Sequence, residues 1–378
     1  MVKAIKVMLI PNNVQKTKLF QYAGASRFAY NWALAREIEN YEKGGKFISD
    51  AELRKEFTKL RHSDEYAWLL NISNNVTKQA IKDACTAYKN FFRGLQKFPR
   101  FKSKKNPVKS YTTNSVNGNI LLKEGKLKLP KAGWIRIRQH RKIREDACLK
   151  GASVCLEADG RYYVSLLYFC EETPVEIRNI RQAVGLDFSM KELYVDSNGK
   201  HAGYPRYFRN SEEKLAKAQR KLSHCRKGSN RYKKQQKKVA RIHTHIAHQR
   251  KDYLHKESRK ITNFYDIVCI EDLDLKTMSG EHHFGKSVHD NGWRMFTDFL
   301  QYKLEREGKK LVRIDRWYPS SRTCSCCGKI KHDLKLEDRV YLCSCGNRMD
   351  RDENAAVNIC REGLRMSGII LEKSEKAS

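Results

Sequence analysis

The stretch AVGLDFSMKELYVDSNGKHAGY, from Ala183 to Tyr204, begins with a short apolar run and carries an Asn-Gly pair at 198–199. The apolar run predicts a strand, and the Asn-Gly pair is typical of a tight turn, so we expect three consecutive strands. Further along, apolar segments at 265–273 and 309–317 predict two more strands, separated by segments with helical periodicity. The alternation of strands and helices predicts an α/β unit.

Two of these predicted strands end in a carboxylate, Asp187 in the first and Glu271 in the 265–273 segment. A third acidic group comes from MDRDENAAVNIC at 349–360. Sites in open α/β sheets form beyond the carboxyl ends of the strands. Converging carboxylates repel one another unless a cation lies between them, and Mg²⁺ prefers oxygen ligands. The alternative interpretation is that each acidic residue only terminates a strand or begins a turn.

The acidic stretch itself offers two candidates for the third carboxylate. Asp350, with Glu353 three residues later, resembles an N-cap and its capping-box partner for the helix that follows. Asp352 then lies in the first turn, free to bind a metal ion. Spacing alone does not exclude Asp350 from that role.

Five of the twelve cysteines lie between 324 and 345. Cys324 and Cys327 have CxxC spacing, and Cys343 and Cys345 have CxC spacing, which predicts a structural Zn²⁺ site with all four positions filled. Cys326 is left over. The remaining seven cysteines are scattered along the chain, which argues against the disulfide framework of a secreted protein and favours a cytoplasmic one.

The charge of the chain indicates a polyanionic partner. Lys and Arg number 76 against 43 acidic residues, for a formal net charge of +33. The predicted helical stretch from about 211 to 262 is especially basic, and Lys234, Lys237 and Arg241 lie roughly opposite its apolar face. We find neither a secretory signal nor an apolar run near the ~18 residues of a membrane span, so nucleic acid is the expected partner.

The N-terminal part predicts a small β-barrel interrupted by a helical lobe. Residues 3–11 predict a strand, and residues 14–97 predict helices, among them one with a capping box formed by Ser49 and Glu52. Val76, Ala80, Ala84, Tyr88 and Phe92 recur every four residues and predict the buried face of another helix. A basic loop at 96–107 follows, and then come short strands with turns at Glu124-Gly125 and Asp159-Gly160.

Several of these motifs occur together in one known family. In order along the chain, VGLDFSMKELYVDSNG, IVCIEDLDL, SSRTCSCCG, the CxC and DRDENAAVNI resemble the TnpB family, the transposon-encoded relatives of type V CRISPR effector nucleases. KVMLIPNNVQKTKLFQYAGASRFAYNWALA near the N-terminus is also similar. The resemblance extends from about residue 3 to residue 363.

The resemblance implies a domain organisation and a set of site residues. It divides the chain into a wedge-like β-barrel (1–13 and 98–176), a helical recognition lobe (14–97), a RuvC-like nuclease domain of RNase H fold (181–320 and 346–366), a zinc-binding insertion (321–345) and a flexible tail (367–378). It implies that Asp187, Glu271 and Asp352 bind two catalytic Mg²⁺ ions and cut DNA by phosphodiester hydrolysis.

The resemblance also implies the partners, a guide RNA and a target double-stranded DNA that carries a short adjacent motif. Arg322 matches a basic position near the active site, and Ser287 and Trp293 lie in a segment expected to border the catalytic groove. Tyr111 and Asn114 are candidates for base contacts.

Other functions remain open at this point. A nuclease-inactive repressor guided by RNA is one, although such a protein is expected to have lost an acidic residue. A transposase and a miniature type V CRISPR effector are others. The guide, the adjacent motif, the cut pattern and the oligomeric state are not given by the sequence.

Overall fold

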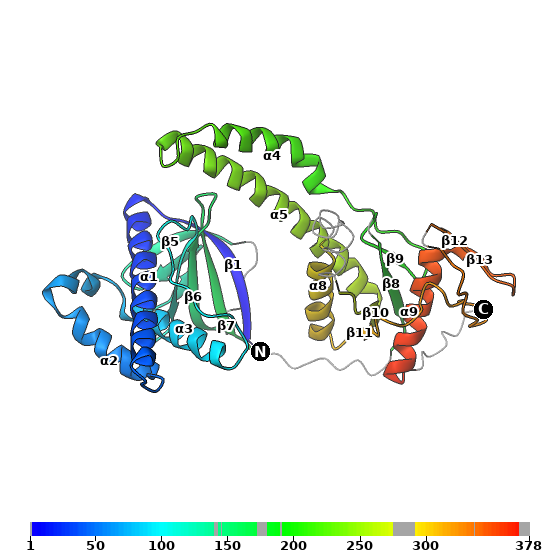
Figure 1. Ribbon diagram of the computed structural model, residues 1–378, viewed down its shortest axis with the longest axis horizontal. Coiled ribbons are helices and arrows are strands. Elements are labelled where there is room, and N and C mark those ends of the chain that lie inside the picture. The colour runs from blue at the N-terminus through cyan, green and yellow to red at the C-terminus, as the bar shows by residue number, and fades with distance from the viewer. Residues whose placement is uncertain are drawn as a thin grey trace. The chain divides into compact units, whose positions relative to one another are not determined.

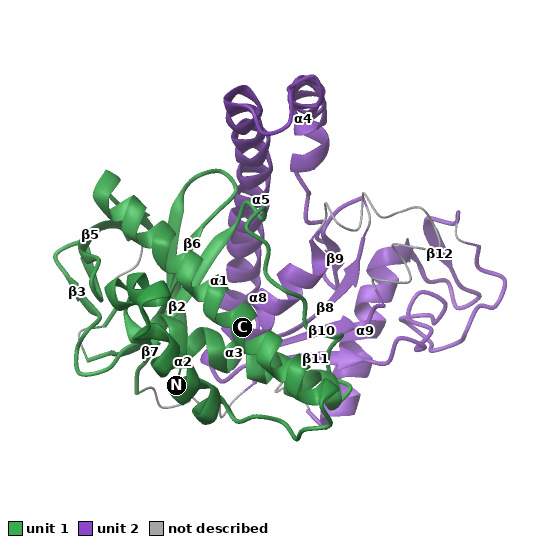
Figure 2. Cartoon of the chain, turned by 60° about the vertical axis from the view of Figure 1, so that its left-hand side comes forward, with its two compact units in different colours: residues 1–172 green, residues 173–378 purple. Residues whose placement is uncertain are grey.

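The computed structural model describes residues 2–139, 143–144, 146–171, 180–189, 191–274, 292–335 and 337–369. The chain divides into unit 1, Met1–Glu172, and unit 2, Thr173–Ser378 (Figure 2). Within the described ranges, we find no helix with the length and apolar character needed to cross a membrane.

Unit 1 is built on a seven-stranded antiparallel sheet with the order β2-β6-β7-β1-β5-β4-β3. Its strands are β1 (Val2–Ile10), β2 (Lys109–Asn114), β3 (Leu121–Lys123), β4 (Lys126–Leu129), β5 (Gly133–Arg138), β6 (Cys148–Leu156) and β7 (Tyr162–Phe169). Among the described residues the end strands β2 and β3 are not paired, so the sheet is open where the sequence predicted a barrel. A strand as short as β3 offers few backbone groups with which β2 could close the sheet.

Both predicted hairpin turns of unit 1 are confirmed. Glu124 and Gly125 join β3 to β4 with φ values of 48° and 70°, as the right-handed twist of a two-residue hairpin requires. Asp159 and Gly160 lie between β6 and β7, where Asp159 Oδ1 accepts a hydrogen bond from the Arg161 backbone N–H at 2.9 Å.

Helices lie between β1 and β2 in the sequence. They are α1 (Asn13–Glu42), α2 (Asp50–Arg61), the 3₁₀ helix η1 (Asp64–Asn71) and α3 (Asn74–Phe92). The capping box of Ser49 and Glu52 is confirmed at the start of α2. In α3 the predicted buried face is confirmed from Val76 to Tyr88, but Phe92 at the end of the helix is 53% exposed. α1 and α3 pack on each other and on β2.

Unit 2 contains a four-stranded sheet with the order β11-β10-β8-β9. Its strands are β8 (Ala183–Phe188), β9 (Tyr194–Asp196), β10 (Ile267–Glu271) and β11 (Lys310–Ile314). β10 runs parallel to both β8 and β11, whereas β9 is antiparallel to β8. The third strand expected after Asn198-Gly199 is reduced to one bridge between Val195 and His201.

Helices cover both faces of the β10 region. Val268 and Ile270 belong to a core cluster that includes Phe296 of α8 (Trp293–Arg306), whereas Cys269 belongs to a second cluster with Ile359 of α9 (Arg351–Ser367). A strand buried on both faces is typical of a parallel sheet inside an α/β layer structure. The continuous apolar character of β10 therefore follows from its central position.

The basic helical stretch predicted from about 211 to 262 is in fact two helices, α4 (Tyr207–Ser223) and α5 (Asn230–Phe264). The break falls where Gly228 adopts a φ of 85° and the Ser229 hydroxyl accepts a hydrogen bond from the Tyr232 N–H at 3.0 Å, which caps α5. Figure 1 shows the two helices as a hairpin that projects from the sheet of unit 2.

α9 packs on β8 closely enough to require glycine at position 185. A Cβ built on Gly185 would lie 2.0 Å from the Ala356 carbonyl oxygen and 2.7 Å from the Cys360 backbone nitrogen. Both contacts are to backbone atoms of α9, which a rotamer change cannot relieve. Gly185 therefore sets the distance between the strand that carries Asp187 and the helix whose first turn carries Asp352.

Substitution of Gly185→Ala is expected to lower the free energy of unfolding of unit 2 by about 1–3 kcal/mol, because the methyl group forces α9 away from β8. Denaturant unfolding followed by intrinsic fluorescence measures the effect. Gly203→Ala is the matched control, since its Cβ meets nothing within 4 Å, and it should change stability by less than about 0.5 kcal/mol. Equal stabilities for the two variants would contradict the close-packing argument.

Candidate functional site

The parallel register brings Asp187 and Glu271 to the same end of the unit 2 sheet. Ile270 of β10 is the partner of Leu186 of β8, so the next residue on each strand is a carboxylate. Glu271 is in turn paired with Ile314 of β11, and its Oε1 accepts a hydrogen bond from the Ser320 hydroxyl. The two acidic residues therefore lie on adjacent strands at their carboxyl ends, as the sequence predicted.

The third carboxylate comes from the start of α9. Asp350 is the N-cap, and its Oδ1 accepts hydrogen bonds from the backbone N–H groups of Asp352 at 2.8 Å and Glu353 at 3.2 Å. This confirms the capping role predicted for Asp350. Glu353 does not complete a capping box; instead its Oε1 lies near the Gly199 turn, 3.0 Å from where a Cβ would stand. The capping leaves Asp352 in the first turn, in an ion pair with Arg351 at 3.5 Å.

The charges of Glu271 and Asp352 act on Asp187. Burial raises the pKa of Asp187 well above its ordinary value, the charges of Glu271 and then Asp352 raise it further, and Arg351 partly opposes them. Burial also raises the pKa of Glu271, against the opposing hydrogen bond from Ser320. Repelling carboxylates at a water-poor sheet edge are suited to a hard divalent cation, which relieves the repulsion and prefers oxygen ligands.

Asp187, Glu271 and Asp352 do not come close enough in this structure to make a metal-binding group. Within the described ranges, the four cysteines alone make a group of three or more His, Cys, Asp or Glu side chains close enough to hold a metal ion. The shared Mg²⁺ site thus stays a prediction, supported by the charge coupling at Asp187.

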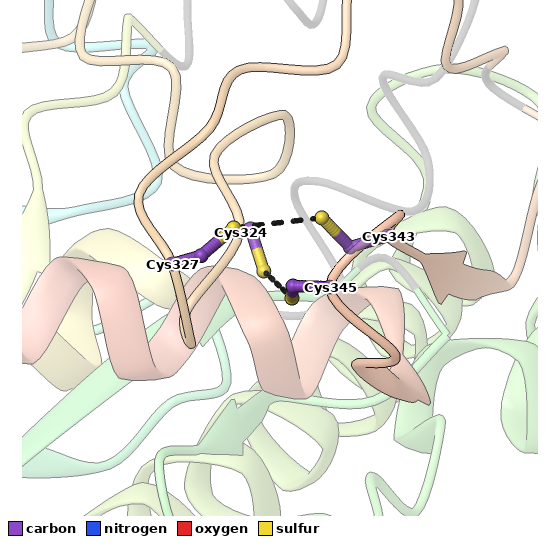
Figure 3. Close-up of side chains that lie close together, drawn as sticks. All are labelled: Cys324, Cys327, Cys343 and Cys345. Carbon is purple, nitrogen blue, oxygen red and sulfur yellow. Dashed lines mark hydrogen bonds between the residues drawn. The ribbon is translucent and has the colours of Figure 1, made fainter.

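Cys324, Cys327, Cys343 and Cys345 bring their sulfur atoms together within 4.8 Å of one another (Figure 3). The Sγ atoms of Cys324 and Cys345 are 3.6 Å apart, as are those of Cys327 and Cys343. A tetrahedral Zn²⁺ with Zn–S bonds of about 2.3 Å requires sulfur separations of roughly 3.8 Å, so the residues fit zinc. The second cysteine pair lies between the short strands β12 (Val340–Leu342) and β13 (Arg348–Asp350), and β13 leads directly into α9.

We call the two cysteine pairs and their loops, residues 320–347, the cysteine knuckle. Two buried asparagines of α9 hydrogen-bond to it. Asn354 donates to the Thr323 carbonyl at 2.7 Å and accepts from the Ser325 N–H at 2.9 Å. Asn358 donates to the carbonyls of Ser320 at 2.8 Å and Thr323 at 2.6 Å. Sequence reasoning missed this link, although two asparagines four residues apart on an otherwise apolar helix face were a possible signal.

A cavity of about 500 Å³ opens beside Glu271. Its lining includes three arginines, Arg294, Arg313 and Arg316, and Arg316 donates to Asp272 at 3.1 Å. Sequence reasoning did not single out these arginines, because they lie on separate elements that only the fold brings together. The lining also includes Asp272, Asp274 and Asp298, so the three guanidinium groups lie among carboxylates.

The other predictions near the site concern Arg322, Trp293 and Ser287, and their outcomes differ. Arg322 is exposed, and its carbonyl accepts from the Tyr341 hydroxyl at 3.0 Å. Trp293 is buried at the start of α8, where it packs on Phe188 with ring centroids 5.4 Å apart and also lines the cavity beside Glu271. Ser287 lies outside the described residues.

The candidate nucleic-acid contacts also differ from one another. Lys234, Lys237 and Arg241 are exposed on α5, and Arg241 lines a groove of about 610 Å³ between α4 and α5. Asn114 is exposed and donates to Gln79 at 3.0 Å. Tyr111, in contrast, is 3% exposed, because the alternation of β2 turns it into the core; the structure does not support a base contact for it.

Three parts of the chain match known families. Residues 168–281 match a family described as "Probable transposase", residues 293–359 match "Cas12f1-like, TNB domain", and residues 1–46 match a "Helix-turn-helix domain". In this structure the described part of the last match forms strand β1 and the single long helix α1.

Curated relatives match almost the whole chain. A protein of Streptomyces pristinaespiralis named "Putative RNA-guided DNA endonuclease" is 34% identical over 368 residues, which cover 97% of this chain and 90% of the relative. InsQ of Escherichia coli K12, which bears the same description, is 31% identical over 379 residues that cover 96% of this chain and 92% of the relative.

A solved structure shares the fold. The "mini-RNA-guided endonuclease CRISPR-Cas_phi3" aligns with a TM-score of 0.52 at 9% identity, over 96% of this chain and 92% of that one. The chain therefore shares its fold with that protein. By sequence, it belongs to the TnpB family, which its full-length relatives at 31% and 34% identity establish.

Replacement of Cys327 or Cys343 by serine is expected to abolish zinc binding, since each removes one of four thiolates. Elemental analysis of purified protein should find one zinc ion per native chain and little zinc in either variant. Cys326→Ser is the control, because Cys326 is exposed in the same loop and lies outside the sulfur cluster. Zinc loss in the control, or zinc retention in the other two variants, would overturn the ligand assignment.

Substitution of Asp187→Asn is expected to stabilise the metal-free fold at high pH. A carboxyl whose pKa is raised on folding binds its proton more tightly in the native state, so its contribution to stability is present below about pH 4 and is lost as pH rises through the folded pKa. In EDTA at pH 8, the variant should melt about 2–4 °C above the native protein, with the gap narrowing in acid.

Asp83→Asn, at an exposed position in unit 1, is the control for that measurement and should leave the melting temperature unchanged. A melting temperature for Asp187→Asn at or below the native value at pH 8 would contradict the electrostatic account of the acidic edge.

Proposed function

We propose that this TnpB-family chain is an RNA-guided, transposon-associated DNA endonuclease that cuts target double-stranded DNA beside a short adjacent motif. The observation that carries the proposal is the electrostatic coupling of Asp187 with Glu271 and Asp352, three acidic residues from three different elements. The names of the two full-length relatives, both RNA-guided DNA endonucleases, support it independently.

We propose further that unit 2 is a RuvC-like nuclease domain of RNase H type. The sheet order supports this: an antiparallel pair, β8 and β9, continues into parallel strands β10 and β11, with acidic residues at the ends of β8 and β10. The His201 bridge beside β9 supplies the remnant of a further edge strand. The cysteine knuckle is then the zinc-binding insertion, and unit 1 comprises the wedge and recognition parts.

In this proposal Asp187, Glu271 and Asp352 hold two Mg²⁺ ions. When bound, such ions lower the pKa of water and neutralise charge on the phosphate. Ser320 orients Glu271 through its hydrogen bond, and Asp350 orients Asp352 by capping the helix. The arginines beside Glu271 hold the phosphate of the scissile strand against this edge.

The basic surface binds the phosphate backbone of nucleic acid without recognising its sequence. Base pairing with a guide RNA supplies the sequence specificity. Residues 211–260 alone hold 17 basic and four acidic residues, and this segment contributes most of α4 and α5. The four clustered cysteines and the scattered positions of the others suit a reducing cytoplasm, where thiolates remain available to zinc.

Cleavage by the purified complex tests the proposal. The protein is co-expressed with its locus RNA and challenged with a plasmid library randomised beside a guide-matched target. Asp187→Ala, Glu271→Ala and Asp352→Asn should each reduce cleavage by more than about 100-fold, since even the outer partners of metal ligands are worth roughly 10- to 100-fold.

Asp350→Asn is the matched control, because asparagine is an equally good N-cap and Asp350 is assigned no metal. It should cut at close to the native rate. Persistent cleavage by Asp187→Ala would refute the active-site assignment, and guide-dependent binding without any cleavage by the native protein would favour a repressor.

A further inference from the structure

Unit 1 contains a cavity of about 400 Å³, bounded by α1, η1 and the start of β2, to which the proposed function assigns no role. Its size falls in the range of small-ligand pockets, roughly 300–1,000 Å³. We define the α1 pocket by the residues that carry the argument below: Gly24, Arg27, Phe28, Trp68, Lys104 and Lys109.

Aromatic rings form one side of the α1 pocket. Trp68 is 45% exposed although it belongs to a ring cluster, with its centroid 5.8 Å from that of Phe28 in an edge-to-face arrangement. Phe28 in turn stacks on Tyr66 at 5.5 Å, which holds it in place. The Trp68 indole is therefore supported from one side and open on the other, as a stacking platform for a planar ring must be.

Three cations gather at the same pocket. Burial lowers the pKa of Lys109, and the neighbouring charges of Arg27 and Lys104 lower it further. None of the three forms an ion pair with a carboxylate in the part of the chain that the structure describes. Like charges that converge without a counter-charge are suited to an anion such as phosphate.

The basic loop that carries Lys104 is anchored to α1. Asn31 donates to the Lys102 carbonyl at 3.0 Å and accepts from the Lys102 N–H at 2.8 Å, while the Lys102 ammonium lies 3.8 Å from the centroid of the Tyr30 ring. Lys109 Nζ donates to the Lys104 carbonyl at 2.6 Å. The cations are thus held in position by the fold.

Gly24 supplies an independent observation. Glycine inside a helix is less favourable than alanine, yet Gly24 lies in the middle of α1 with nothing within 4 Å of where its Cβ would be. No packing contact among the residues that the structure describes explains it. The open space faces the α1 pocket, where a side chain would occupy room that a ligand needs.

We propose that the α1 pocket binds one unpaired nucleotide of the guide RNA, with its base stacked on Trp68 and its phosphate among Arg27, Lys104 and Lys109. Folded RNA presents unstacked bases in loops and bulges before any target is bound, whereas target DNA offers unpaired bases only in the strand that guide pairing displaces. The side-chain amides of Gln21 and Asn71, which also line the pocket, can hydrogen-bond to the base edge or the ribose hydroxyl. This inference rests on the proposed function only for the identity of the RNA.

Binding of the locus RNA by the full-length protein tests the pocket without any cleavage step. Trp68→Ala and Gly24→Leu should each weaken binding roughly tenfold, the first by removing the stacking surface and the second by filling the pocket. Trp68→Phe, which keeps a ring, should restore most of the affinity. Trp134→Ala is the matched control, since Trp134 is 41% exposed on β5, outside the pocket, and it should change affinity less than twofold.

Photocrosslinking identifies the bound strand. The complex is irradiated with either 4-thiouridine in the locus RNA or 4-thiothymidine in the target DNA, and crosslinked peptides are mapped by mass spectrometry. A crosslink to Trp68 from RNA supports the proposal. A crosslink from DNA alone, or none from either strand, overturns it, as does equal RNA binding by the Trp68→Ala and Trp134→Ala variants.

The readouts separate this inference from the proposed function. A native protein that crosslinks RNA at Trp68 but cuts no DNA leaves the pocket assignment standing and contradicts the nuclease. A native protein that cuts DNA while Trp68→Ala binds RNA normally contradicts the pocket alone. Thermal unfolding of both pocket variants should match the native protein, because Trp68 is exposed and Gly24 faces open space.

Discussion

The close packing of α9 on β8 is the constraint on which the candidate site depends. Position 185 leaves no room for a side chain, so the helix whose first turn carries Asp352 is held against the strand that carries Asp187. The parallel register of β8 and β10 then adds Glu271. In this arrangement the charges of Glu271 and Asp352 raise the pKa of Asp187, although the three residues are distant in sequence. A divalent cation between the carboxylates would relieve this repulsion.

The cysteine knuckle extends the same arrangement. Its loop is hydrogen-bonded to α9 through Asn354 and Asn358, and Ser320, at the start of that loop, donates to Glu271. Zinc at the knuckle would order the loop and, through these bonds, both the Glu271 carboxylate and the N-terminus of α9. Such a structural ion would support the acidic edge without taking part in its chemistry.

Local signals made much of this fold predictable. The Glu124-Gly125 turn and the Asp350 cap depend on neighbouring residues, which the sequence shows directly. The break before α5 was missed because basic, helix-forming residues lie on both sides of it, although Gly228 and the N-cap residue Ser229 mark the interruption. Two features depend on tertiary packing, which no local pattern records. They are the burial of the Tyr111 side chain and the hydrogen bond from Ser320 to Glu271. The RuvC-like assignment and the metal roles of the three carboxylates stay predictions.

The most direct test of the central claim is the location of a divalent ion. Anomalous diffraction from crystals of the protein grown with Mn²⁺, a stand-in for Mg²⁺ with a measurable signal, shows which side chains hold the ion. The account predicts density coordinated by carboxylate oxygens of Asp187, Glu271 and Asp352, and its loss in Asp187→Asn. Ordered Mn²⁺ bound elsewhere, with these three side chains turned away from one another, would contradict it.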